Sequence, residues 1–331
     1  MSEPATANIS AKKRVGYFDL AKGVLMIFIV MIHMGGVGVH IYPEFVWMFN
    51  LPAFFIISGY FFKPEESFGK FTKHKIQQLL IPYIVCLIPV FLYVIAWAFF
   101  KDTSISYSYS HRSIHNDPSW FIFSLFIIFL EYYFIRKIHN VYIQFGIVIL
   151  LALAGTYLPS DGIDIKVLNA MQYLIYFWIG AKWRELKWDN IIFNKVLAAV
   201  CFIIFAVLSI FYSISSEYET FIKSSPLYFI GALSGTIVLL HFCQYFDHVP
   251  LINYIGEASL VFLMFHQYIL FLTARGLHIT NPGIMLISTL AILFPIAYIS
   301  RRYFPWLVGR KTRRISDSST KSFVAKESET V

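Results

Sequence analysis

Charged residues and cysteines are scarce in this sequence. Asp, Glu, Lys and Arg make up only 14% of the 331 residues, whereas soluble domains carry about 25%. This shortage excludes a soluble two-domain enzyme and a disordered chain. The 3 cysteines, Cys86, Cys201 and Cys243, all lie inside apolar runs. We therefore expect small core residues and not a disulfide scaffold.

Hydrophobic residues are correspondingly abundant. They make up 58% of the chain, and aromatics alone make up 19%. One globular core cannot bury so much apolar surface, so the composition predicts an all-α, polytopic membrane helical bundle. The formal net charge is +8. Because Lys and Arg lie between the apolar runs, topology explains this charge better than nucleic-acid binding does.

The apolar runs are long enough to cross a bilayer, which takes roughly 20 residues. Polar or turn-forming segments separate them. We expect about ten transmembrane helices, at residues 17–39, 44–62, 78–100, 119–135, 141–158, 167–182, 192–214, 226–244, 251–273 and 283–304. The first run has no small-residue cleavage pattern, so we expect a retained helix and not a signal peptide.

The positions of Lys and Arg predict that both termini are cytoplasmic. With the N-terminus inside, the inner segments carry 21 of these residues and the outer loops carry 5. Cytoplasmic segments of membrane proteins show this excess. We expect a cytoplasmic segment at 1–16, a transmembrane domain at 17–304 and a basic, disordered cytoplasmic tail at 305–331.

Three ionisable residues, Asp19, Lys22 and His33, lie in the first run. Lys22 and His33 differ by only about 20° around a helix axis and lie roughly 16 Å apart along it. Asp19 precedes Lys22 by three residues, so all three share a face. Ionisable groups in membrane helices usually face the bundle interior or a watery cavity.

These residue types suit acyl or group transfer to a hydroxyl. His33 would be a general base with a near-neutral pKa, and Lys22 would hold an anionic group such as the phosphates of an acyl donor. Two structural alternatives stay open. Asp19 and Lys22 can simply pair at the cytoplasmic end, with Lys22 reaching toward water, and His33 can simply bond a neighbouring carbonyl.

Asp19, Lys22, Gly23 and His33 resemble the opening of the membrane-bound acyltransferase 3 family. That family has a D-x-x-[RK]-G element and an apolar run that ends at a His, and Lys22 stands where Arg is commoner. The resemblance implies an O-acetyltransferase of the plasma (bacterial inner) membrane. It implies acetyl-CoA as the donor and a carbohydrate hydroxyl, on a lipid-linked or surface polysaccharide, as the acceptor. His33 would act as base or covalent relay, and Asp19 would orient Lys22.

The second run also resembles the family, in which a Pro and aromatics precede a Ser-Gly-Tyr motif. Here these residues are Pro52 and then Ser58, Gly59 and Tyr60. The resemblance implies that Ser58 and Tyr60 form a cofactor-binding wall beside His33. The alternative is a kink at Pro52 and close helix approach at Gly59.

A basic segment containing Lys73 and Lys75 precedes the third run. This segment also resembles the corresponding part of the family. The sequence has no Walker-type or dinucleotide glycine loop. Phosphate binding would therefore need these lysines, and the resemblance implies that they contact the nucleotide of acyl-CoA. Positive-inside anchoring is the alternative.

Two later motifs complete the resemblance. Trp120 is followed by Phe121, and Gly256 is followed by Ser259 and then by His266. The resemblance implies that Trp120, Ser259 and His266 bind substrate. Ser259 and His266 lie about 10 Å apart along a helix, which argues against a direct nucleophile–base pair. An interfacial anchor for Trp120 and helix–helix hydrogen bonds for the other two are the alternatives.

No spaced His/Asp/Glu cluster indicates a metal site, so we expect no metal and no nucleic-acid partner. Membrane lipids are expected neighbours, and a homo-oligomer stays open. The main rival function is a transporter or exporter of a polysaccharide or its precursor, because ten spans with few buried charges also suit a passage. A membrane subunit that organises polysaccharide assembly is a third alternative.

Overall fold

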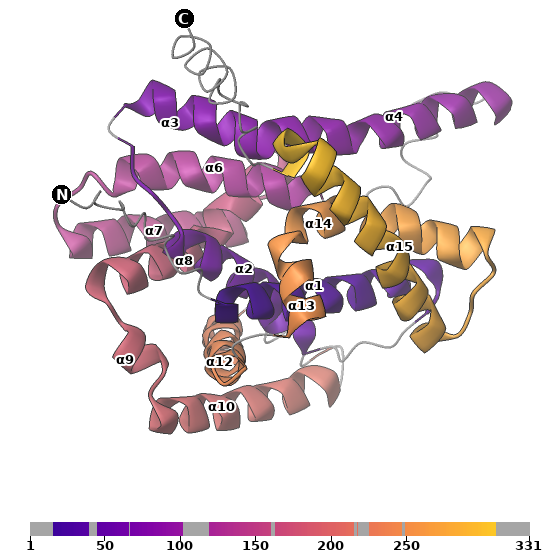
Figure 1. The fold of residues 1–331 in the computed structure, drawn as a ribbon. Coiled ribbons are helices and arrows are strands. Elements are labelled where there is room, and N and C mark those ends of the chain that lie inside the picture. The colour runs from indigo at the N-terminus through magenta and orange to yellow at the C-terminus, as the bar shows by residue number, and fades with distance from the viewer. Residues whose placement is uncertain are drawn as a thin grey trace, which may run out of the picture.

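The structure is a computed structural model that describes most of residues 16–308. The ranges outside this description are 1–15, 40–44, 66, 102–118, 160–162, 215–216, 218–224, 247–248 and 309–331. Most of the expected N-terminal segment and tail therefore lies outside the described residues, as does most of the longest expected outer loop. The regular structure of the described residues is entirely helical (Figure 1), which confirms the all-α prediction.

Each apolar run of the sequence corresponds to a helix or a pair of helices. The α-helices are α1 (Gly16–Met34), α2 (Val46–Tyr60), α3 (Phe68–Lys75), α4 (Ile81–Lys101), α6 (Ser119–Ile135), α7 (Val141–Tyr157), α8 (Ile165–Leu186), α9 (Asp189–Ile192), α10 (Lys195–Ile214), α12 (Pro226–Cys243), α13 (Pro250–Glu257), α14 (Ser259–Phe271) and α15 (Pro282–Tyr303). Short 3₁₀ turns follow α1 (Gly35–Val37) and α15 (Pro305–Val308). Two π-helical turns are η2 (Ile76–Leu80) and η4 (Leu272–Gly276).

Several helices are long and apolar enough to cross a membrane. In the described part of the chain there are five: Gly16–Val37, Lys195–Ile214, Pro226–Cys243, Ser259–Gly276 and Pro282–Tyr303. Shorter apolar helices occupy Val46–Tyr60, Trp120–Ile135 and Val141–Tyr157. A membrane protein is thus supported, whereas the number of ten spans and the cytoplasmic termini stay predictions.

Polar side chains fix where several helices begin. Asn140 caps α7 and Asp164 caps α8, each by accepting from backbone N–H groups of the first turn. Ser225 and Asn281 cap α12 and α15 in the same way, and a proline follows each of them. Such caps satisfy N–H groups that have no partner inside the helix. The breaks between these apolar runs are therefore encoded locally.

The helix predicted across residues 251–273 is interrupted, so the expectation of one continuous helix is wrong. Ala258 has φ −102° and ψ 13°, which lies between the regular helical and extended regions. The chain therefore changes direction between α13 and α14 (Figure 1). Ser259 becomes the first residue of α14.

Glycines bring α13 directly onto α1. A Cβ added to Gly23 would overlap the carbonyl oxygen of Ile252, and one added to Gly256 would overlap the carbonyl oxygen of Asp19. The two backbones therefore touch where they cross, as small residues allow in membrane bundles. This crossing fixes the position of α1 relative to α13 near Asp19.

The same device joins α2 and α8. A Cβ on Gly59 would overlap the carbonyl oxygen of Phe177, and one on Gly180 would overlap that of Ile56. The close helix approach predicted at Gly59 is confirmed. Beside this crossing, Phe55 stacks on Tyr173 with ring centroids 4.8 Å apart, so the two helices pack closely against each other.

Helices α3 and α4 continue each other through η2 and form one long rod (Figure 1). The helix therefore begins at Phe68, well before the apolar run predicted from residue 78. A π-helical turn inserted in such a rod often marks a functional site.

The cysteines agree with the prediction of small core residues. Cys201 and Cys243 are buried and form no disulfide, and the side chain of Cys86 lies outside the described part.

Candidate active site

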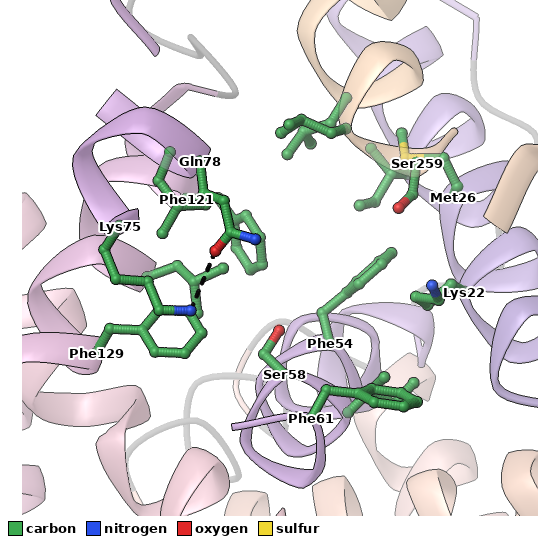
Figure 2. Close-up of a pocket in the computed structure, with 16 residues that line it drawn as sticks. Lys22, Met26, Phe54, Ser58, Phe61, Lys75, Gln78, Phe121, Phe129 and Ser259 are labelled. Atoms are coloured by element: carbon green, nitrogen blue, oxygen red, sulfur yellow. Dashed lines mark hydrogen bonds between the residues drawn. The ribbon is translucent and has the colours of Figure 1, made fainter. Parts of the chain in front are cut away.

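A cavity of about 390 Å³ lies among α1, α2, α6, α14 and the rod formed by α3 and η2 (Figure 2). Its walls follow helical spacing. On α1, Lys22, Met26 and Ile29 line the cavity, and on α2, Phe54 and Ser58 do. Residues three or four apart share one face of a helix, so each wall is one helix face. Most of this lining is apolar.

Lys22 supplies positive charge at one side of the cavity. Its Nζ lies 2.7 Å from Oδ1 of Asp19, as their spacing of three residues predicts. Asp19 is buried and does not line the cavity, whereas Lys22 does. A buried charge requires a partner, and the ammonium group of Lys22 provides one for the buried carboxylate of Asp19.

Lys75 supplies a second cation on the opposite side of the cavity (Figure 2). Its Nζ lies 3.6 Å from the ring centroid of Phe129 and donates to Oε1 of Gln78 at 3.2 Å. Lys75 precedes the third predicted span. Burial lowers the pKa of its ammonium group to about 8, although Glu65 opposes this shift. Lys75 therefore places a largely buried cation at the cavity wall.

Two hydroxyl groups also line the cavity. Ser58 comes from α2, and Ser259 begins α14 directly after the break at Ala258. Figure 2 shows both hydroxyls directed toward the cavity. A hydroxyl both donates and accepts hydrogen bonds, so these serines can bind the polar groups of a largely apolar ligand.

His33 lies one helical turn beyond the lining residue Ile29 and is not itself part of the cavity wall. Its Nδ1 is 2.8 Å from the carbonyl oxygen of Ile29. Because a carbonyl only accepts, Nδ1 carries the hydrogen, and the neutral ring keeps a lone pair on Nε2. The bond of His33 to a neighbouring carbonyl was predicted as a structural alternative to catalysis. Because this bond uses Nδ1, it leaves Nε2 available as a base. The His33 ring contacts that of His266, with centroids 4.8 Å apart.

A family model described as an acyltransferase domain, that of the acyltransferase 3 family, matches residues 15–302. The chain belongs to this family. It is therefore a membrane acyltransferase, and the matched region contains the whole cavity and both histidines. No curated protein and no solved structure matches the chain.

The acyltransferase brings only part of the predicted site to the cavity. Lys22, Ser58, Lys75 and Ser259 line it. Asp19 contributes through Lys22, and the two histidines follow the lining residues Ile29 and Leu263 along α1 and α14.

The remaining predicted residues lie elsewhere. Lys73 is exposed on α3, because a separation of two residues turns it about 200° away from Lys75. Tyr60 packs on Trp183, with ring centroids 4.7 Å apart. Trp120 packs beside Tyr173 at 6.3 Å and adjoins the lining residue Phe121. Their predicted binding roles stay predictions.

The acyltransferase cavity also contains residues that sequence analysis did not single out. Gln78 follows Lys75 by three residues, and this helical spacing was the only available signal for it. Phe54 belongs to the aromatics that follow Pro52 but had no individual signal, and Phe129 had none, because the sequence is rich in phenylalanine throughout. Within the described residues, no group of three or more His, Cys, Asp or Glu side chains could hold a metal ion.

Proposed function

We propose that this acyltransferase transfers an acetyl group from acetyl-CoA to a carbohydrate hydroxyl of a cell-surface or lipid-linked polysaccharide. One observation carries the proposal. Two cations, Lys22 and Lys75, face each other across a cavity whose α1 wall leads to the base His33. Family membership supports acyl transfer, and this arrangement favours an anionic donor with its reacting group at some distance from its charge.

The donor lies with its phosphates at the lysine end. Lys22 and Lys75 hold the phosphate that joins the pantetheine arm to the nucleotide, and Met26 and Ile29 contact the arm. A volume of about 390 Å³ is at the lower end for ligand pockets. The cavity therefore holds the arm, and the nucleotide lies outside it, on the side of the exposed Lys73.

The thioester then lies near His33, roughly 16 Å from Lys22 along α1. The Nε2 atom of His33 takes the proton of the acceptor hydroxyl as that oxygen attacks the thioester carbonyl carbon. The carbon–sulfur bond breaks, and the leaving thiolate takes the proton from His33. The products are the acetyl ester and the free thiol of CoA.

The acceptor sugar approaches past Trp120, which adjoins the cavity wall at Phe121. An indole ring suits the apolar face of a sugar, and the hydroxyls of Ser58 and Ser259 suit polar groups of the bound substrates. The protein lies in the plasma (bacterial inner) membrane with both termini cytoplasmic. The donor enters from the cytoplasm, consistent with the predicted inner position of Lys75.

The test uses purified full-length protein, radiolabelled acetyl-CoA and a panel of cell-envelope glycans. Wild type, His33→Ala and a matched control, His241→Ala, are compared. His241 lies on α12 and bonds Gln244 and Tyr245, away from the cavity.

Label on a glycan with wild type and His241→Ala, but not with His33→Ala, supports the proposal. Thermal unfolding and acetyl-CoA binding establish that each variant is folded. A folded wild type that binds no acetyl-CoA and labels no glycan contradicts the proposal and favours an exporter.

A further inference from the structure

A second histidine lies against His33. His266, which sequence analysis assigned to substrate binding, is on α14 and has no exposed surface. The two imidazole rings meet edge to face, with centroids 4.8 Å apart and an interplanar angle of 72°. They come from helices far apart in the sequence that pack side by side, so tertiary structure alone creates the pair.

Both rings have the same tautomer. Nδ1 of His266 lies 3.0 Å from the carbonyl oxygen of Phe262 and 2.9 Å from that of Leu263, and Nδ1 of His33 lies 2.8 Å from that of Ile29. Since carbonyls only accept, both Nδ1 atoms carry hydrogen. In the neutral pair, both Nε2 atoms are acceptors and cannot bond to each other.

The Nε2 atom of His266 is buried and has no hydrogen-bond partner among the described residues. Buried polar atoms are normally paired, and an orphan in a native protein calls for an explanation. A hydroxyl group of the substrate could bond to Nε2 of His266 only by reaching a fully buried atom, so the substrate is a poor candidate for this partner. The adjacent ring of His33 is already in contact.

We propose that His266 is a positioning residue whose buried Nε2 accepts a hydrogen bond from His33 when His33 holds the acceptor's proton. This inference rests on the proposed function. Protonation turns Nε2 of His33 from an acceptor into a donor. This donor can then bond to the orphaned Nε2 atom of His266, whose ring already contacts that of His33. The proton stays on His33 until the leaving thiolate takes it.

The interaction exists only after the proton has moved, so it stabilises the reacting state and not the resting complex. Such an interaction raises kcat and leaves KM for the donor unchanged. A residue that merely fills space would instead change protein stability. A residue that binds the ground-state substrate would change KM.

The experiment compares His266→Gln with His266→Met in the full-length protein. These side chains are similar in length and flexibility, but only glutamine supplies a carbonyl oxygen that accepts strongly. We expect His266→Met to lower kcat roughly 10- to 100-fold, the range for a hydrogen bond to a charged group, with KM for acetyl-CoA unchanged. We expect His266→Gln to recover most of this loss.

The controls separate three outcomes. Thermal unfolding midpoints and acetyl-CoA binding must match between the two variants, and His241→Met must keep the kcat of wild type. Equal kcat in the Gln and Met variants overturns the inference even if wild type transfers acetyl, and so does a change confined to KM. Failure of wild type to transfer acetyl would contradict the proposed function itself.

Discussion

Helix α1 stabilises its polar side chains differently at its two ends. Near its start, the ammonium group of Lys22 is held by the carboxylate of Asp19 at 2.7 Å. Near its end, His33 is held by a backbone carbonyl and by the ring of His266. A buried charge needs a counter-charge, whereas a neutral imidazole needs only one hydrogen bond that fixes its tautomer. One end therefore suits binding of an anion, and the other suits proton transfer.

The largest expected effect concerns the His33 end. His33→Ala removes the base, so kcat should fall about 10²- to 10⁴-fold. KM for acetyl-CoA should stay unchanged, because the proposed binding mode has the donor's phosphates at the other end of α1. Steady-state kinetics over a range of donor concentrations measures both quantities. A tenfold rise in KM with unchanged kcat would remove the distinction between the two ends.

A second effect concerns how tightly each end is packed. Gly23→Ala places a methyl group against the Ile252 carbonyl, and overpacking of this kind costs about 1–3 kcal/mol. The matched control is Gly36→Ala in the 3₁₀ turn that follows α1, where an added Cβ meets nothing within 4 Å. Thermal unfolding in detergent should show a lower midpoint for the first variant only. Equal midpoints would mean that the crossing with α13 can relax.

A third effect concerns the charge near the start of α1. Lys22→Met should raise KM for acetyl-CoA about tenfold, because one hydrogen bond to a charged group is lost, and kcat should change little. Lys22→Arg keeps the charge and should recover most of the affinity. Binding of acetyl-CoA, measured by calorimetry, tests this directly. If kcat falls instead, Lys22 acts in the chemistry and not only in binding.

The smallest effect is a pH dependence of donor binding. Burial disfavours the charged form of Lys75 and lowers its pKa to about 8. The lysine is charged below this pH and loses its proton above it, so affinity for acetyl-CoA should weaken severalfold as pH rises from 7 to 9. Lys75→Arg stays charged throughout this range and should abolish the dependence. An identical pH profile in both proteins would exclude Lys75 from the donor site.

The sequence predicts local features of the site well. The shared face of Lys22 and Asp19 and the close approach at Gly59 follow from helical spacing and from residue size. Hydropathy was less informative about where helices begin, because it reports burial and not helical structure. The rod therefore starts at Phe68. Because Lys73 and Lys75 both lie in this helix, two residues apart, they point to different sides of it, although both are predicted to contact the nucleotide.

Tertiary relations were beyond the reach of the sequence. The contact of His33 with His266 depends on how α14 lies along α1, and that placement follows the change of direction at Ala258. Gly256, Glu257 and Ser259 interrupt the apolar pattern around Ala258, but such a short polar stretch also occurs inside continuous helices, so it did not by itself indicate a break. The orphaned Nε2 of His266 is likewise visible only once all neighbouring helices are in place.

The π-helical turn η2 has an evolutionary consequence. An i→i+5 turn contains one residue more than an α-helical turn, and one residue corresponds to about 100° of rotation. Deleting one residue within Ile76–Leu80 would rotate Lys75 relative to α4 and turn it away from the cavity. A one-codon insertion or deletion could therefore place a cation at this position of the cavity wall or remove it, without any other change of sequence.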